Sequence, residues 1–110
     1  MGCARATVQA GVCGLVTEIT ARSDDEQAVR FTIASDCANI TELSAKLPAE
    51  VDAYAELGSG YAGELWQAAQ ATLRGCCSGC VVPAALFKAM QVAAGVALPA
   101  DSHIELAAGE

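Results

Sequence analysis

Apolar and polar residues alternate in the first third of the chain, and this alternation predicts three β-strands. The alternation is clearest in the third strand, where Val29, Phe31 and Ile33 are expected to face inward. A glycine-flanked turn, Gly11–Gly14, and a polar acidic loop at 23–27 separate the strands, so we expect hairpin connections. The predicted strands are residues 4–10, 15–22 and 28–34.

The period changes to that of helices after residue 36. Asn39 with Glu42 three residues later approximates a capping box, and Asp36 is an alternative cap for the same helix. Pro48 is expected to end or kink this helix, and Pro99 to end the last one. The predicted helices are residues 39–47, 49–57, 61–73 and 82–98.

Alternation returns at the end of the chain, where Ser102–Ala107 predicts a closing strand with His103 and Glu105 on one face. Three strands, four helices and a closing strand predict an α+β two-layer sandwich. Its helices would cover one face of a mainly antiparallel sheet of about four strands. No repeat or linker divides the chain, so residues 1–110 are interpreted as a single domain.

Composition narrows the classes of function. Hydrophobic residues make up 54% of the chain and charged residues 17%, which argues against disorder. The net charge of −7, without any basic cluster, argues against nucleic-acid binding and against anionic membrane surfaces. The most apolar stretch, 81–100, contains Lys88, Gln91 and two prolines, so we interpret it as a core helix. With no stretch of signal-peptide type, we expect a cytoplasmic protein.

Six cysteines are the main chemical feature of this chain. The cytoplasm keeps thiols reduced, so metal or redox use is favoured over a disulfide framework. Cys77 and Cys80 form a CxxC pair, and Pro83 places Cys80 just outside a helix N-terminus, where a thiolate is stabilised. Cys13, in the glycine turn, and Cys37, at a strand-to-helix junction, also lie at element ends.

We therefore expect Cys13, Cys37 and Cys80 to meet at one edge of the sheet, with Cys77 or Cys76 as a fourth ligand. Because histidine is scarce, a zinc ion would take four cysteines, and an iron–sulfur cluster also uses thiolates. The pattern leaves the choice between zinc and iron–sulfur open. Further candidates are weaker: Cys3 near the N-terminus, His103 as a ligand, Asp36 as a base, and Lys88 as a counter-charge to thiolates.

Three segments resemble a family of small uncharacterised three-cysteine proteins of anaerobic bacteria and methanogenic archaea. They are Ala10–Gly14, Ser35–Cys37 with Asn39-Ile40, and Cys80–Pro83 leading through Lys88-Ala89 to Val92–Pro99. In that family's pattern, proline often follows the second and third motif cysteines, and Ala38 and Val81 stand there in this chain. The resemblance favours Cys13, Cys37 and Cys80 over the other cysteines and implies an anaerobic context in which thiols are stable. It implies no reaction.

These observations lead to three functional hypotheses. The first is a cysteine-ligated metal or iron–sulfur protein that acts as a carrier, a sensor or a small redox partner of another metalloenzyme or redox enzyme. The second is a thiol–disulfide redox protein that uses Cys77 and Cys80. The third is a non-catalytic homo-oligomeric binding module, in which alanine-rich helices pack between two copies and the cysteines stay reduced.

Overall fold

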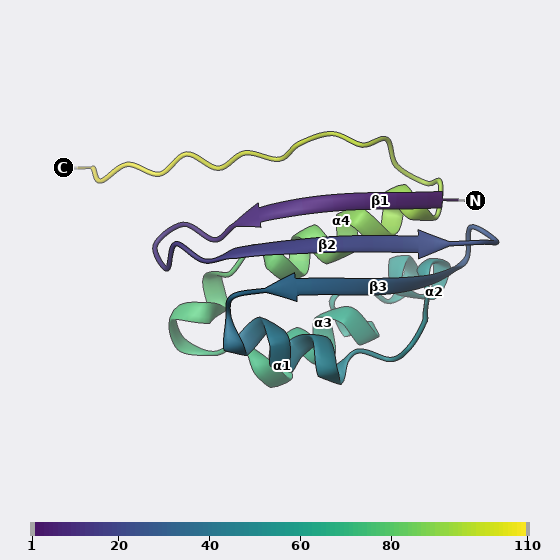
Figure 1. Ribbon diagram of the computed structural model, residues 1–110, viewed down its shortest axis with the longest axis horizontal. Coiled ribbons are helices and arrows are strands. Elements are labelled where there is room, and N and C mark those ends of the chain that lie inside the picture. The colour runs from purple at the N-terminus through teal and green to yellow at the C-terminus, as the bar shows by residue number, and fades with distance from the viewer. Residues whose placement is uncertain (1, 110) are drawn as a thin grey trace.

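A four-stranded antiparallel sheet forms one layer of the molecule (Figure 1). The computed structural model describes residues 2–109. Three long strands run in chain order, and a two-residue strand extends the sheet beside the third. The strands are β1 (Gly2–Gln9), β2 (Val16–Ser23), β3 (Ala28–Ser35) and β4 (Val51–Asp52).

Helices cover one face of this sheet, and within residues 2–109 the other face has no helix over it (Figure 1). Helix α4 packs on β1 and β2, α1 packs on β3, and α3 contacts both α1 and α4. The α+β fold predicted from the sequence is confirmed. The helices are α1 (Ala38–Lys46), α2 (Ala53–Ser59), α3 (Glu64–Thr72) and α4 (Val82–Ala93), with 3₁₀ turns η1 (Gly60–Ala62) and η2 (Gly75–Gly79).

The core forms because the alternating strand positions meet the apolar side of the helices. Ile19 and Val29 from the sheet are fully buried, as are Leu43 of α1 and Leu86 and Met90 of α4. The inward positions predicted for the third strand are confirmed, because Val29 is buried and Phe31 and Ile33 pack against the core. The stretch Gly75–Ala93 is long and apolar enough to cross a membrane by length and composition. In the fold it divides into η2 and α4, and α4 contributes buried residues to the hydrophobic core.

The end of α4 differs from the prediction. The helix stops at Ala93, and Gly95 adopts a positive φ of 77°. The N–H of Val96 donates to the carbonyl of Gln91, and the N–H of Gly95 donates to that of Val92. These bonds form a Schellman motif, so Gly95 ends the helix and Pro99 does not.

The predicted closing strand at Ser102–Ala107 is wrong. Residues 96–109 have no regular secondary structure, and the side chains of Ile104 and Leu106 are exposed (Figure 1). The fourth strand is β4, which pairs Val51 with Val29. A two-residue strand carries no alternation, so only its pairing with β3 identifies it.

A buried carboxylate connects two of the helices. Glu56 of α2 is only 4% exposed, and its two oxygens accept hydrogen bonds from the backbone N–H groups of Glu64 and Leu65 at 2.9 and 2.8 Å. A carboxylate at a helix N-terminus satisfies free N–H groups and complements the positive end of the helix dipole. A Cβ at Gly63 would lie 2.9 Å from an oxygen of Glu56, so the close approach requires glycine there.

Replacing Glu56 should therefore destabilise the fold. We expect Glu56→Ala to lower the free energy of unfolding by about 2 kcal/mol, because the part-buried N–H of Glu64 and the buried N–H of Leu65 lose their acceptor. Glu42→Ala is the matched control, since the exposed Glu42 makes only a long contact of 4.0 Å with Lys46. Urea unfolding followed by circular dichroism measures both variants, and equal losses would contradict the capping role.

Candidate functional site

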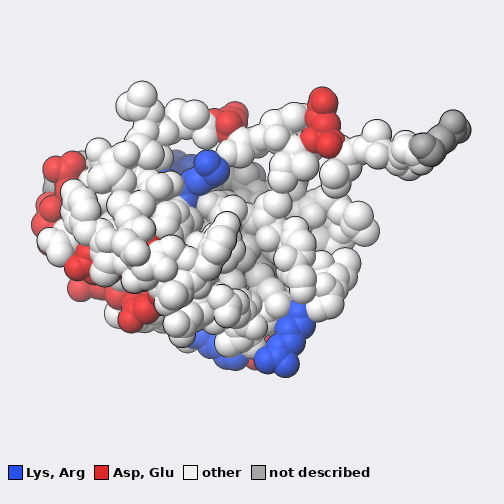
Figure 2. Space-filling view, turned by 180° about the vertical axis from the view of Figure 1, so that it is seen from behind, with Lys and Arg blue, Asp and Glu red and all other residues white. Residues whose placement is uncertain are grey.

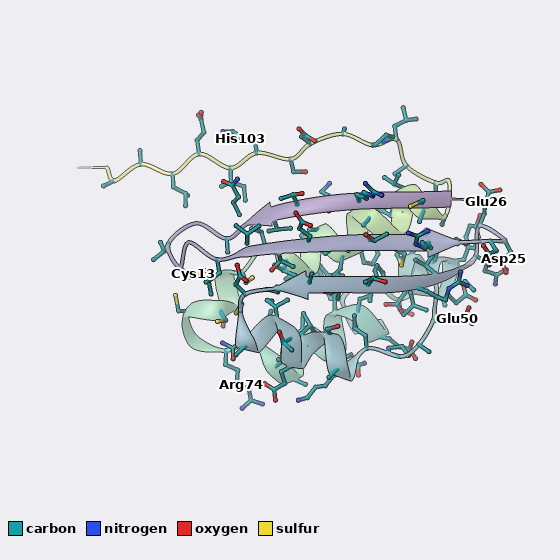
Figure 3. The ribbon with its side chains drawn as sticks, viewed as in Figure 1. Cys13, Asp25, Glu26, Glu50, Arg74 and His103 are labelled. Atoms are coloured by element: carbon teal, nitrogen blue, oxygen red, sulfur yellow. The ribbon has the colours of Figure 1, made fainter. Side chains whose placement is uncertain are left out.

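One end of the sheet gathers the ends of three segments that carry cysteines. The β1–β2 turn lies at this end, because Gln9 is paired with Val16. The C-terminal end of β3 lies beside it, because Ser35 is paired with Thr17 and the N–H of Asp36 donates to the carbonyl of Val16 at 3.4 Å. Turn η2 and the start of α4 approach from the helical layer (Figures 1 and 3).

Cys13 is presented by the tight turn that the sequence predicts. Gly11 and Gly14 both have a positive φ, 85° and 70°, which residues with a side chain rarely adopt. The N–H of Gly14 donates to the carbonyl of Gly11 at 2.9 Å and closes the turn. Cys13 is exposed as a result, and Figure 3 shows it at the tip of the β1–β2 turn.

Cys37 is fixed by hydrogen bonds that begin in the core. The hydroxyls of Thr17 and Ser35 lie 2.7 Å apart, and Thr17 is buried. The Ser35 hydroxyl also accepts a hydrogen bond from the N–H of Cys37 at 3.1 Å. Cys37 is the N-cap of α1, and its side chain makes no capping bond. The predicted caps, Asn39 with Glu42 or Asp36, are therefore wrong.

One side-chain hydrogen bond connects α1 to η2. The side-chain amide of Asn39, in the first turn of α1, donates to the sulfur of Cys77 at 3.3 Å. Within the CxxC pair, the N–H of Cys80 donates to the carbonyl of Cys77 at 3.1 Å. Cys80 then directly precedes Val81, the N-cap of α4, so its predicted place outside a helix N-terminus is correct. Cys76 is exposed on the same turn.

Burial and neighbouring thiols act together on Cys80. Desolvation raises the pKa of the Cys80 thiol above its ordinary value, and a hydrogen bond from the N–H of Val82 acts in the opposite direction. The negative charges that Cys77, Cys37 and Cys13 would carry as thiolates raise this pKa further. From the sequence, the helix end is expected to stabilise a thiolate at Cys80. In the structure, burial outweighs that effect, so the expectation is wrong in sign.

These sulfurs share one end of the molecule without forming a finished ligand set. All six cysteines are free thiols. Across residues 2–109, no three His, Cys, Asp or Glu side chains lie close enough together to hold a metal ion as they stand. Asp25, Glu26 and Glu50 lie at the opposite end of the sheet from Cys13 (Figure 3). At the cysteine end, Asp36 directly precedes Cys37 and adds one exposed carboxylate to the soft sulfur donors.

The other candidates lie away from this end or serve another role. Cys3 is exposed on β1 and is paired with Arg22, close to the other end of the sheet. His103 is exposed in the C-terminal segment, 3.5 Å from the carboxylate of Glu105. Lys88 is exposed on α4 and lines a groove that no cysteine lines. Ser35, Thr17 and Asn39 support the thiols through contacts that form only in the tertiary structure, so the sequence does not predict this role.

Comparison with known proteins gives one match. A family model described as a family of unknown function (DUF6951) matches residues 4–106. No curated protein and no solved structure matches the chain.

The raised pKa of Cys80 leads to a test of thiol reactivity. We expect alkylation of Cys80 by iodoacetamide to have a higher pH midpoint in the folded protein than in the urea-unfolded chain, because burial and neighbouring thiolates disfavour its ionisation. Peptide mass spectrometry measures modification at each cysteine, and the exposed Cys3 controls for reagent activity. A midpoint at or below that of the unfolded chain would show that the helix end dominates after all.

Proposed function

We propose that this chain, which belongs to the DUF6951 family of unknown function, is a cytoplasmic metal-binding protein whose cysteines ligate zinc or an iron–sulfur cluster. The ligands are Cys13, Cys37 and Cys80, with Cys77 as the fourth and Cys76 as its alternative. The observation that carries the proposal is the gathering of three cysteine-bearing segments at one end of the sheet.

The donor chemistry supports a thiophilic metal. Thiolates prefer zinc, copper(I) and iron–sulfur clusters, whereas magnesium and calcium require oxygen ligands. The three acidic residues labelled in Figure 3 lie at the far end of the sheet, whereas Asp36, directly before Cys37, is an exposed carboxylate at the cysteine end. The three motif cysteines also match the pattern of the anaerobic family that the sequence resembles. That context would keep the thiols reduced.

A bound cation would reverse the electrostatics of the free thiols. In the free protein, each ionised cysteine disfavours ionisation of Cys80. A cation placed among the sulfurs stabilises all the thiolates together, so binding would release protons. Loading requires the sulfurs to draw closer than they stand. The segments that would move are the Gly11–Gly14 turn and η2, which both lie outside the core.

The site suits a carrier, a sensor or a small electron-transfer partner better than an independent enzyme. The motif cysteines lie on turns and half-exposed junctions, where a larger redox or metalloenzyme partner can reach them. The acidic chain disfavours nucleic acid as a partner. A second copy of the chain is a further partner to be tested.

Metal content of the protein tests this proposal. After anaerobic purification, we expect about one equivalent of zinc, or iron with sulfide and visible absorption, from the ligand count. Cys13→Ser, Cys37→Ser and Cys80→Ser should each reduce the bound metal severalfold. Cys3→Ser is the matched control and should retain it, since Cys3 lies near the other end of the sheet. Wild-type metal content in all four variants, or no uptake of zinc or iron by the wild type, would contradict the proposal.

The proposal also predicts that metal affinity depends on pH. Zinc or cobalt(II) affinity should fall between pH 8 and pH 6, because protons compete for the thiolates. The raised pKa of Cys80 strengthens this dependence, because a metal ion must displace a proton that the thiol holds more tightly. Cobalt(II) titration followed by thiolate-to-metal charge-transfer absorption measures this change, and an affinity independent of pH would contradict thiolate ligation.

One observation favours a second candidate, a thiol–disulfide redox protein. The bond from the N–H of Cys80 to the carbonyl of Cys77 closes the CxxC into a turn and holds the two residues near one another. Peptide mapping after mild oxidation separates the candidates. A Cys77–Cys80 disulfide in a protein that takes up no metal would replace the metal proposal. Full cellular function in a triple Cys13/Cys37/Cys80→Ser variant would instead indicate a binding module without thiol chemistry.

A further inference from the structure

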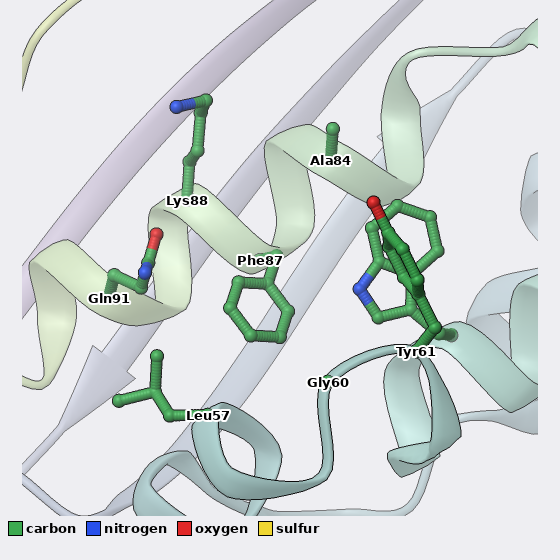
Figure 4. Close-up of a pocket in the computed structure, with 8 residues that line it drawn as sticks. Leu57, Gly60, Tyr61, Ala84, Phe87, Lys88 and Gln91 are labelled. Carbon is green, nitrogen blue, oxygen red and sulfur yellow. The ribbon is translucent and has the colours of Figure 1, made fainter.

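A groove lies on the helical side of the molecule, between α4 and the segment that runs from α2 through η1 into α3 (Figure 4). Its volume is about 390 Å³, within the usual range of small-molecule sites. Figure 2 shows that the surface on this side is largely uncharged, with acidic residues mainly toward one edge. No cysteine lines the groove, so it is independent of the proposed metal site.

Aromatic rings line the groove from both sides, one on α4 and two on the η1–α3 segment. The chain has five aromatic residues, and Tyr61, Trp66 and Phe87 all line this groove. Tyr61 and Trp66 meet edge to face with ring centroids 4.9 Å apart and an interplanar angle of 89°. Tyr61 is nevertheless 74% exposed. Rings held in place but left open to solvent offer a rigid apolar surface to a flat ligand.

The opposite end of the groove is polar and carries a positive charge. Lys88 and Gln91 are three residues apart on α4, so they lie on the same side of that helix (Figure 4). The groove has no Asp or Glu in its lining, in a chain of net charge −7. Across the described residues, Lys88 forms no ion pair, whereas Lys46 is paired with Glu42. An ammonium beside an amide can hold a carboxylate group.

The apolar lining and the single positive charge of the groove indicate the kind of ligand that it would bind. We propose that this groove binds a small molecule that joins a flat apolar body to a single carboxylate. The apolar body lies along Phe87 toward the Tyr61–Trp66 pair, and the carboxylate is held by Lys88 and Gln91. Leu57 closes the groove on the side of α2.

Trp66 makes the proposal directly measurable, because it is the only tryptophan in the chain. We titrate the full-length protein with 3-phenylpropionate and follow Trp66 emission, with neutral 3-phenylpropanamide and cationic 3-phenylpropylamine as matched probes. We expect saturable binding of the carboxylate, weaker binding of the amide and none of the amine. Lys88→Met should weaken carboxylate binding about fivefold, the equivalent of about 1 kcal/mol for a partly exposed charge pair.

Lys46→Met is the matched control, since Lys46 is an exposed lysine on α1 that lies outside the groove, and its carboxylate affinity should equal that of the wild type. Far-ultraviolet circular dichroism confirms that each variant is folded. Three outcomes of the titration overturn the proposal: equal binding of the three probes, no saturable change in emission, or unchanged affinity in folded Lys88→Met. Trp66 emission that changes on dilution of the ligand-free protein would show that a second copy covers the groove, and this too would overturn it.

Discussion

The packing of α4 against β1 and β2 is the contact on which the rest of the structure depends. Val82, Leu86 and Met90 point from one side of the helix into the core and are almost completely buried. Full burial of such side chains contributes about 1.5–3 kcal/mol each, before the cost of ordering them. With that side fixed, the N-terminus of α4 holds Cys80 near the β1–β2 turn, and the less buried side chains of Phe87 and Lys88 line the groove.

At the end of the sheet where the cysteines lie, burial opposes the effect of the α4 N-terminus on the pKa of Cys80. A helix N-terminus favours a thiolate, but Cys80 is partly desolvated and faces other thiols. The pKa of the Cys80 thiol is raised as a result, so this thiol holds its proton more tightly and is less suited to nucleophilic attack. The supporting polar contacts, Thr17 with Ser35 and Asn39 with Cys77, lie on the sheet and on α1. The positions of the sulfurs therefore depend on both layers.

Alanine has a direct role in this arrangement. Ala21, Ala53, Ala89 and Ala93 are almost completely buried, which lets helices approach the sheet closely. A backbone contact shows the same closeness, because a side chain at Gly2 would overlap the carbonyl of Ala93. Few aromatic rings are then needed inside, and three of the five line the surface groove instead.

The sequence by itself determined the elements whose signals are local. Alternation placed the three long strands and their inward residues, and glycine spacing placed the turn that presents Cys13, because side-chain period and backbone freedom act over a few residues. Pro83 likewise marked the start of α4. The sequence also named the cysteines that gather at one end of the sheet. It carried the signal for the end of α4 in Gly95, although Pro99 was the more obvious breaker.

Only the tertiary structure decided features that rest on partners distant in the chain. Strand β4 exists because Val51 reaches Val29, and α3 begins where Glu56 supplies its cap. Ser102–Ala107 alternates like a strand but pairs with nothing in residues 2–109, since alternation describes a strand's faces and cannot supply a neighbour. The pKa of Cys80 and the groove beside Trp66 have the same origin. Burial and thiols from other segments set the pKa of Cys80, and α4 together with the α2–α3 segment forms the groove. Neither feature can be predicted from a local pattern.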